Sequence, residues 1–399
     1  MHPSAHGARG AVRVELADIV RAHAPALLAR ERLAGVQQRA LRAIERCRTA
    51  ALGGEISRCN HCGETHYVYH SCRNRHCPKC QTLAKERWRA ARRAELLPVP
   101  YFHLVFTLPH EFNALAQGHP RLIYELLFTA ASATLREFGR NPHWAGGEIA
   151  ATLVLHTWGQ TLTQHLHVHA LVAGGALAPD ARWIAPRRGF LFPVKALSKV
   201  FRGKFLDAVA SHFEQDSLRC EGSIAALTDP AARRTFLARL RAKPWVVYAK
   251  HTLGHPEQVL DYLSRYVQRV AISNERLLSL DDGVVRFAYR DRAHDNRRKT
   301  MSLPATQFLG RFLLHVLPTG FTRIRHYGLL ANRNKGERLA QARAALNLPA
   351  PPAVPVESVQ TFCQRVLSID IHRCPVCRIG TLHPTGTLAP QLIHRSRPP

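Results

Sequence analysis

Acidic residues are scarce in this chain. Its 399 residues contain 28 Asp and Glu against 56 Lys and Arg, which leaves a formal net charge of +28. An excess of positive charge on this scale predicts a polyanionic partner, with nucleic acid as the first candidate. A lipid surface is less favoured, because the basic residues are spread along the whole chain rather than gathered on one amphipathic helix.

Long apolar runs are also missing. No stretch approaches the roughly 18 apolar residues of a membrane-spanning helix. The N-terminus carries no apolar block after a basic start, so we see no secretory signal. These absences predict a protein without a membrane partner, located in the cytoplasm.

The sequence has no internal repeat, and strand-like and helix-like patterns alternate loosely along it. This alternation predicts an α+β fold, and 46% hydrophobic residues are ample for its core. We expect a helical, cysteine-rich domain over residues 1–98 and an α+β domain over 99–346. A proline-rich linker over 347–356 then leads to a small tail over 357–399.

Six of the ten cysteines fall within residues 47–80. In a chain without a signal sequence, this clustering indicates metal binding rather than a disulfide framework. Cys59 and Cys62 form one CxxC pair, and Cys77 and Cys80 form another. Two such pairs at this separation predict a closed, structural four-thiolate zinc site. Cys47, Cys72 and nearby histidines leave a second zinc site open as an alternative.

The tail holds a single further CxxC pair, Cys374 and Cys377. We expect it to bind zinc only with a third and fourth ligand, for which His372, His383 and Cys363 are candidates. Basic residues surround the first cysteine segment, Arg73 and Arg75 among them. That charge favours contact with a DNA backbone.

The segment "QHLHVHALVAGG" places histidines at positions 165, 167 and 169 with apolar residues between them. On a β-strand, side chains two residues apart share one face, so the three imidazoles should point the same way. Imidazole is a common ligand of divalent metals. On this segment alone, a metal site and a polar stripe on a half-buried strand are both open interpretations.

The segment "QVLDYLSRYVQRVAIS" has helical periodicity and carries two stripes. One stripe is apolar, and the other consists of Tyr262, Arg265, Tyr266 and Arg269. Two border tyrosines with arginines beside them are one interpretation. Combined with a metal held by histidines, the other is that a tyrosine attacks a DNA phosphate and holds a covalent 5′-phosphotyrosine. Such a reaction needs single-stranded DNA.

The chain resembles rolling-circle transposases of the insertion sequence ninety-one (IS91) family. Five segments carry the resemblance in the family's order: "SCRNRHCPKCQ", "YFHLVFTLP", "HTWGQTLTQHLHVHALVAGG", "YLSRYVQRVAIS" and "RIRHYGLLANR". The resemblance implies an HUH-endonuclease domain, an antiparallel sheet flanked by helices, preceded by a helical zinc-binding domain. It also implies a Mg²⁺ or Mn²⁺ cofactor, structural Zn²⁺ and transposition of a bacterial insertion sequence.

By this resemblance, His167 and His169 form the His–hydrophobic–His metal pair, and Tyr262 and Tyr266 are the nucleophiles. His165 is then a neighbour without a ligand's role.

The motif alone does not specify the third metal ligand. We expect His156, because residues 148–159 should pair with the histidine strand. Gln160 and Gln268 are the alternatives.

The arginines predicted to contact DNA lie in three segments: Arg73, Arg75, Arg265, Arg269, Arg323 and Arg325. The prediction is therefore a transposase that cleaves and joins single-stranded DNA at the bacterial nucleoid. A replication initiator or relaxase of the same chemistry is one alternative. A non-catalytic, zinc-containing DNA-binding protein is the other. The sequence leaves the DNA ends, the order of the tyrosines and the oligomeric state open.

Overall fold

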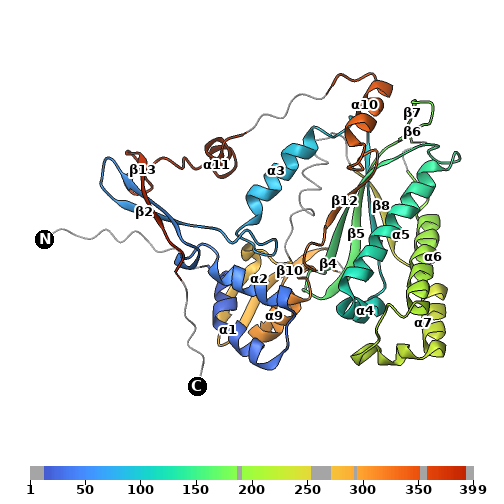
Figure 1. Cartoon of the computed structure of the whole chain (residues 1–399), viewed down its shortest axis with the longest axis horizontal. Helices are drawn as coiled ribbons and strands as arrows, with labels where there is room; N and C mark the ends of the chain where they lie inside the picture. The colour runs from blue at the N-terminus through green and yellow to red at the C-terminus, as the bar shows by residue number, and fades with distance from the viewer. Residues whose placement is uncertain (1–12, 187–190, 253–270, 292–293, 351–356, 392–399) are drawn as a thin grey trace. The chain divides into compact units, whose positions relative to one another are not determined.

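Helices and antiparallel strands are mixed along the chain, which confirms the predicted α+β class (Figure 1). The structure is a computed structural model. It describes residues 13–186, 191–252, 271–291, 294–350 and 357–391. Among the described helices, none has the length and apolarity that crossing a lipid bilayer would require.

The chain folds into two compact units, each built from separate stretches of sequence. Unit 1 combines residues 1–84, 272–310 and 353–399, and unit 2 combines residues 85–271 and 311–352. The predicted boundaries at residues 98 and 346 therefore differ from the observed division. Two segments that we assigned elsewhere, the central 272–310 and the tail, belong with the N-terminal unit, because their strands and helices pack there.

Unit 2 is built around a five-stranded sheet of order β12-β4-β5-β3-β8, in which every neighbouring pair is antiparallel. Its strands are β3 (Tyr101–Thr107), β4 (Ala150–Trp158), β5 (Gln164–Ala173), β8 (Val247–Thr252) and β12 (Ile324–Gly328), with a small pair, β6 (Ala176–Leu177) and β7 (Trp183–Ile184). Its helices are most of α3 (Gln81–Arg93), α4 (Asn113–Gly118), α5 (Pro120–Arg140), α6 (Val194–Glu214), α7 (Pro230–Ala242) and α10 (Lys335–Ala345). The expected pairing of 148–159 with the histidine strand is confirmed by β4 and β5.

The two faces of this sheet have different partners. One face packs Leu166 and Val168 of β5 in a large core with Phe128 of α5 and Phe201 of α6. α5 and α6 lie side by side along that face (Figure 1). Because strand side chains alternate, the histidines of β5 lie on the opposite face. A smaller core occupies part of that second face, where Trp88 of α3 and Leu339 of α10 pack against buried Val154 and Leu171.

Unit 1 holds two three-stranded antiparallel sheets. The first has the order β13-β1-β2, from β1 (Gly54–Cys59), β2 (Thr65–Tyr69) and β13 (Leu382–Leu388). The second has the order β11-β10-β9, from β9 (Leu277–Asp281), β10 (Val284–Asp291) and β11 (Arg297–Pro304). Its helices are α1 (Leu16–Arg30), α2 (Gly35–Arg46), most of α9 (Ala305–Leu313) and α11 (Val359–Leu367).

A fully buried histidine in unit 2 forms hydrogen bonds both to β4 and to the turn between β4 and β5. His315 Nε2 lies 3.0 Å from the carbonyl oxygen of Leu162, and its Nδ1 lies 3.2 Å from Oγ1 of Thr157. Nε2–H therefore donates to the carbonyl, and Nδ1 accepts from the hydroxyl. Burial lowers the pKa of His315 to about 4, because the charged form is poorly solvated there.

We predict that unit 2 loses stability as the pH falls from about 6.5 to about 4. Above this window His315 is neutral whether the chain is folded or unfolded, so it has no effect. Within the window the unfolded chain takes up a proton that the folded chain refuses, which favours unfolding. All five tryptophans lie in unit 2, so urea unfolding followed by their fluorescence reports on this unit.

Compared at pH 7 and pH 5, the wild type should lose about 2 kcal/mol more unfolding free energy than His315→Gln, which keeps an N–H donor without a titrating ring. Equal losses in the two proteins would contradict the assignment of a neutral His315.

Candidate metal centre

Three imidazoles come together near the β4–β5 turn of unit 2. One ring nitrogen from each of His156, His167 and His169 lies within 4.8 Å of the corresponding atoms of the other two. All three side chains are buried, at 4%, 8% and 6% exposure. The structure thus gathers the predicted histidine pair and the first-choice third ligand at one point.

Strand register explains why these three residues meet. His156 of β4 is directly opposite His167 of β5 in the antiparallel ladder, and His169 is opposite Val154. His156 and His169 are therefore diagonal neighbours on the same face, with ring centroids 4.5 Å apart. A sharp turn after β4, where Gly159 N–H donates to the Thr163 carbonyl, starts this register.

Hydrogen bonds at Nδ1 determine which nitrogen of each ring carries the lone pair that a metal would bind. Nδ1 of His167 lies 2.9 Å from the backbone oxygen of His165, so it must carry a proton and donate. The lone pair of His167 is then on Nε2. Nδ1 of His169 lies 2.8 Å from Nε2 of His103, so a proton on His169 Nδ1 likewise places the lone pair of His169 on its Nε2.

His103, on β3, was not among the predicted site residues. It is 3% exposed, and burial together with the charge of Lys250 lowers its pKa to about 4. It is therefore neutral at pH 7 and able to accept a hydrogen bond. The sequence holds a signal for it, because "YFHLVFT" puts a lone histidine on an apolar strand, and β3 pairs with the histidine strand.

Three imidazole nitrogens suit a borderline divalent metal and add no charge to it. With three protein ligands, such an ion keeps coordination positions for water or phosphate oxygens. The donor set therefore fits a catalytic rather than a closed structural site.

The predicted nucleophiles Tyr262 and Tyr266 lie outside the described residues, as do Arg265, Arg269 and Gln268. Gln160 is described and is half-buried in the β4–β5 turn. The choice of third ligand thus stays a prediction, with His156 favoured by its place in the cluster.

Eight cysteines of unit 1 form two clusters of four, and their membership corrects the predicted pairing. Cys77 and Cys80 gather with Cys47 and Cys72, all four sulfurs lying within 4.8 Å of one another. Cys80 Sγ is 3.4 Å from Cys47 Sγ and 3.6 Å from Cys72 Sγ. The neighbouring thiols of Cys47 and Cys72 donate to Cys80 and hold its pKa far below the usual range.

The other predicted zinc ligands, Cys59 and Cys62, form the second cluster with Cys374 and Cys377 of the tail. The prediction that the two N-terminal CxxC pairs share one ion is wrong for this arrangement. So is the expectation that His372, His383 or Cys363 completes the tail pair within the described cluster. The reason is the sheet: β1 ends at Cys59 and pairs with β13, which brings the tail to this end of β1.

Two of the predicted DNA-contacting arginines, Arg73 and Arg75, are exposed beside the first cluster. Arg325 has a different environment. Its guanidinium makes a two-pronged ion pair with Glu125 at 2.5 and 2.7 Å and lies 4.3 Å from the ring centroid of Phe128. This position favours a structural role over phosphate binding. Arg323 is half-buried and directly precedes β12.

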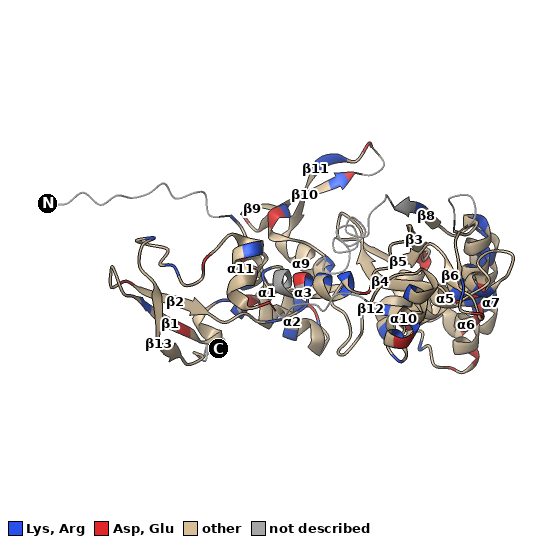
Figure 2. Ribbon diagram, turned by 90° about the horizontal axis from the view of Figure 1, so that it is seen from above, with Lys and Arg blue, Asp and Glu red and all other residues tan. Residues whose placement is uncertain are grey.

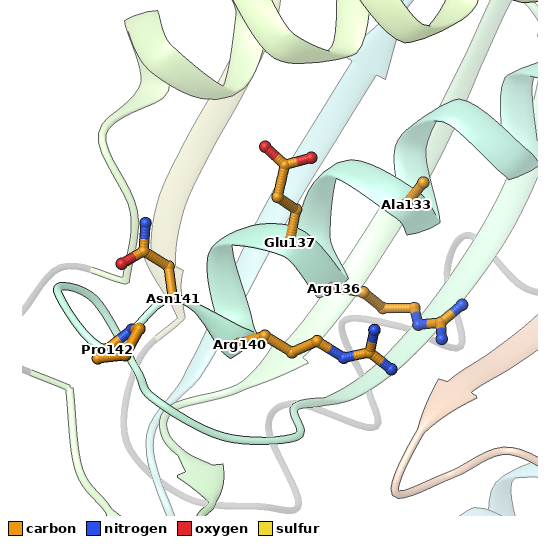
Figure 3. A pocket seen from close by; sticks show the side chains of 6 residues that line it. All are labelled: Ala133, Arg136, Glu137, Arg140, Asn141 and Pro142. Atoms are coloured by element: carbon orange, nitrogen blue, oxygen red, sulfur yellow. The ribbon is translucent and has the colours of Figure 1, made fainter.

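Lys and Arg are numerous on α7, α10 and the β10–β11 hairpin (Figure 2). An open hollow lies at the end of α5, lined by Ala133, Arg136, Glu137, Arg140, Asn141 and Pro142. Arg136 and Arg140 extend to the same side, away from Glu137 (Figure 3). The hollow is separate from the histidine cluster, because α5 packs on the opposite face of the sheet.

Comparison with known proteins gives consistent matches over most of the chain. A family model described as "Putative transposase" matches residues 150–338, and one described as "Transposase zinc-binding domain" matches residues 19–108. The chain is 44% identical over 373 residues to "Putative transposase y4qJ" of Sinorhizobium fredii, covering 92% of this chain and 94% of the relative. It is 28% identical over 335 residues to "Transposase for insertion sequence element IS801" of Pseudomonas savastanoi pv. phaseolicola, covering 83% and 79%.

We predict that Arg325→Met destabilises unit 2 by about 1–2 kcal/mol, because it leaves the partly buried Glu125 without its counter-charge. Urea unfolding measures the loss. The double change Arg325→Met/Glu125→Gln should recover part of it, since no lone charge then remains. A stable Arg325→Met protein that binds DNA more weakly would instead support the original assignment as a DNA contact.

Proposed function

We propose that transposition proceeds by metal-dependent cleavage and joining of single-stranded DNA through a 5′-phosphotyrosine. The premise is that the chain belongs to the IS91 family of transposases. As a transposase of an insertion sequence, the protein acts on DNA, which its net charge of +28 suits. The observation that carries the finer proposal is the cluster of His156, His167 and His169.

Of the two expected ions, Mn²⁺ fits three imidazole nitrogens better than the harder Mg²⁺ does. Hydrogen bonds within the cluster also orient these rings for binding. Nδ1 of His167 is engaged by a backbone carbonyl and Nδ1 of His169 by His103, so both Nε2 atoms are set for binding before any ion arrives. When bound, the ion would polarise the scissile phosphate and neutralise charge that develops on it. The role of the chain is to hold the three rings on one rigid sheet face.

Tyrosine supplies the nucleophile in this proposal. The phenolic oxygen of Tyr262 or Tyr266 forms a bond to phosphorus as the bond to the 3′ oxygen breaks. The covalent link conserves the phosphodiester energy, so a free 3′-hydroxyl reverses the step and joins a strand without a nucleotide cofactor. Two tyrosines can hold two DNA ends in turn. Arg265 and Arg269, each three residues after a tyrosine of the same predicted stripe, would contact the phosphates.

The zinc-binding domain has a supporting role. We assign one Zn²⁺ to Cys47, Cys72, Cys77 and Cys80, all within the matched residues 19–108. A four-thiolate site leaves no open position, so its contribution is to fold a basic module. The exposed Arg73 and Arg75 lie on that module and would contact the DNA backbone.

We predict a covalent protein–DNA adduct when the protein is mixed with Mn²⁺ and a labelled single-stranded oligonucleotide from an end of its element. Denaturing electrophoresis would show the labelled band. Tyr262→Phe/Tyr266→Phe should abolish it, because neither ring then has an oxygen to attack phosphorus. An adduct that persists in the double variant would refute the proposal.

Two controls make this assay specific. Tyr248→Phe removes a tyrosine that is 49% exposed on β8, and it should leave the adduct unchanged. His167→Ala/His169→Ala should abolish the adduct while the zinc content stays that of the wild type. DNA binding without any adduct in the wild type would favour a non-catalytic DNA-binding protein.

We further predict that His103→Leu raises the Mn²⁺ concentration for half-maximal adduct formation by about 10–100-fold, because His169 loses the acceptor that fixes its ring. His103→Gln, whose side-chain oxygen can accept the same bond, should recover most of the affinity. Electron paramagnetic resonance of free Mn²⁺ measures binding independently of the reaction. Equal behaviour of the Leu and Gln variants would show that His103 does not act through this bond.

A further inference from the structure

The second cysteine cluster joins parts of the chain that are far apart in sequence. Cys59 and Cys62 lie at the β1–β2 turn, and Cys374 and Cys377 lie in the turn that precedes β13. Sγ of Cys59 is 3.7 Å from Sγ of Cys377, and Sγ of Cys62 is 3.7 Å from Sγ of Cys374. Residues that are 318 and 312 positions apart in the sequence are thus neighbours in space.

These distances fit a shared metal ion. Four sulfurs bound tetrahedrally at about 2.3 Å from zinc are roughly 3.8 Å from one another. A disulfide would require about 2.05 Å, and all four residues are free thiols. Four thiolates in a tetrahedron select zinc over the hard, oxygen-seeking cations.

The backbone around the sulfurs has hydrogen bonds suited to thiolate ligands. The N–H of His61 lies 3.4 Å from Sγ of Cys59, and the N–H of Gly380 lies 3.4 Å from Sγ of Cys377. Each CxxC pair therefore presents one sulfur that accepts a backbone N–H, the kind of contact that stabilises a thiolate ligand.

The two CxxC turns are also bonded directly to each other. The N–H of Thr381 donates to Oδ1 of Asn60 at 2.8 Å, and the N–H of Asn60 donates to the carbonyl of Thr381 at 3.1 Å. Gly380 lies so close that a Cβ there would be 2.4 Å from Sγ of Cys59. The fit between the turns is therefore built into the sequence and does not depend on the sulfurs alone.

Strand pairing continues the same contact. β13 pairs antiparallel with β1 from Cys59↔Leu382 to Gly54↔Leu388, beside the β1–β2 hairpin (Figure 1). The tail is thus the third strand of a sheet whose other two strands belong to the N-terminal segment.

We infer that Cys59, Cys62, Cys374 and Cys377 bind a second structural Zn²⁺, which makes the tail an integral half of the N-terminal zinc-binding module. Two of these ligands lie outside the residues 19–108 that match the zinc-binding family model. The chain accordingly carries two zinc ions. The second ion links Cys59 and Cys62 to Cys374 and Cys377, and the sequence between these two pairs contains all of unit 2. This inference does not depend on the proposed DNA reaction.

The assignment is tested by the zinc content of the purified full-length protein. Inductively coupled plasma mass spectrometry measures this content. The wild type should contain two zinc ions per chain. Cys374→Ser/Cys377→Ser and Cys59→Ser/Cys62→Ser should each contain one, and the combination of all four changes should still contain one. This non-additivity identifies the four residues as members of a single site, because removing either half already empties it.

The matched control is Cys363→Ser, a cysteine of the same tail that belongs to neither cluster and should leave two zinc ions. One zinc in the wild type would overturn the inference. So would two in the Cys374→Ser/Cys377→Ser variant, or a loss of zinc from Cys363→Ser.

Alkylation of the wild type tests the same zinc assignment without any variant, so its result does not depend on how the variants fold. With zinc bound, Cys374 and Cys377 should resist iodoacetamide, as located by peptide mass spectrometry, and a chelator should expose both. Alkylation of either residue in the zinc-loaded protein would equally overturn the assignment.

Discussion

The register between β4 and β5 is the constraint on which the candidate metal centre depends. It sets His156 opposite His167 and places His169 on the same face. A slip of one residue in β5 would turn its histidines toward α5 and α6 and its leucine and valine away from them. Because that face holds the main hydrophobic core, the slip would be strongly unfavourable. The packing of α5 and α6 on one face therefore positions the histidines of the candidate metal centre on the other face.

Burial of several histidines beside this core would be costly if their nitrogens lacked partners. The hydrogen bonds that satisfy them also prepare the site. The carbonyl of His165 fixes the ring of His167, and His103 fixes that of His169. His103 itself stays neutral, because its pKa is about 4. A protonated ring at this position would repel a metal cation, so the apolar surroundings favour both folding and the chemistry that we propose.

Local patterns in the sequence were sufficient where the structure depends on local rules. Alternation in "QHLHVHALVAGG" correctly set the histidines on one face of β5, and the predicted pairing of residues 148–159 with this strand is the β4–β5 pair. The pairing of CxxC motifs followed no local rule, since the spacing within each pair is the same. Which CxxC pairs come together depends on the pairing of β1 with β13. The ion pair of Arg325 could not be predicted for a related reason: its partner Glu125 lies 200 residues away on α5.

The tail shows why a metal belongs at that junction. Between residues 357 and 391 only Phe362, Cys374 and Gly380 are buried, while Val376 and Ile379 are 65% and 69% exposed. A segment with so little buried apolar surface cannot fold on a core of its own. One strand pairing and the contacts between two turns give limited stabilisation. A four-thiolate zinc ion adds binding free energy that is available only when both halves are in place, so it links the folding of the tail to that of the N-terminal segment.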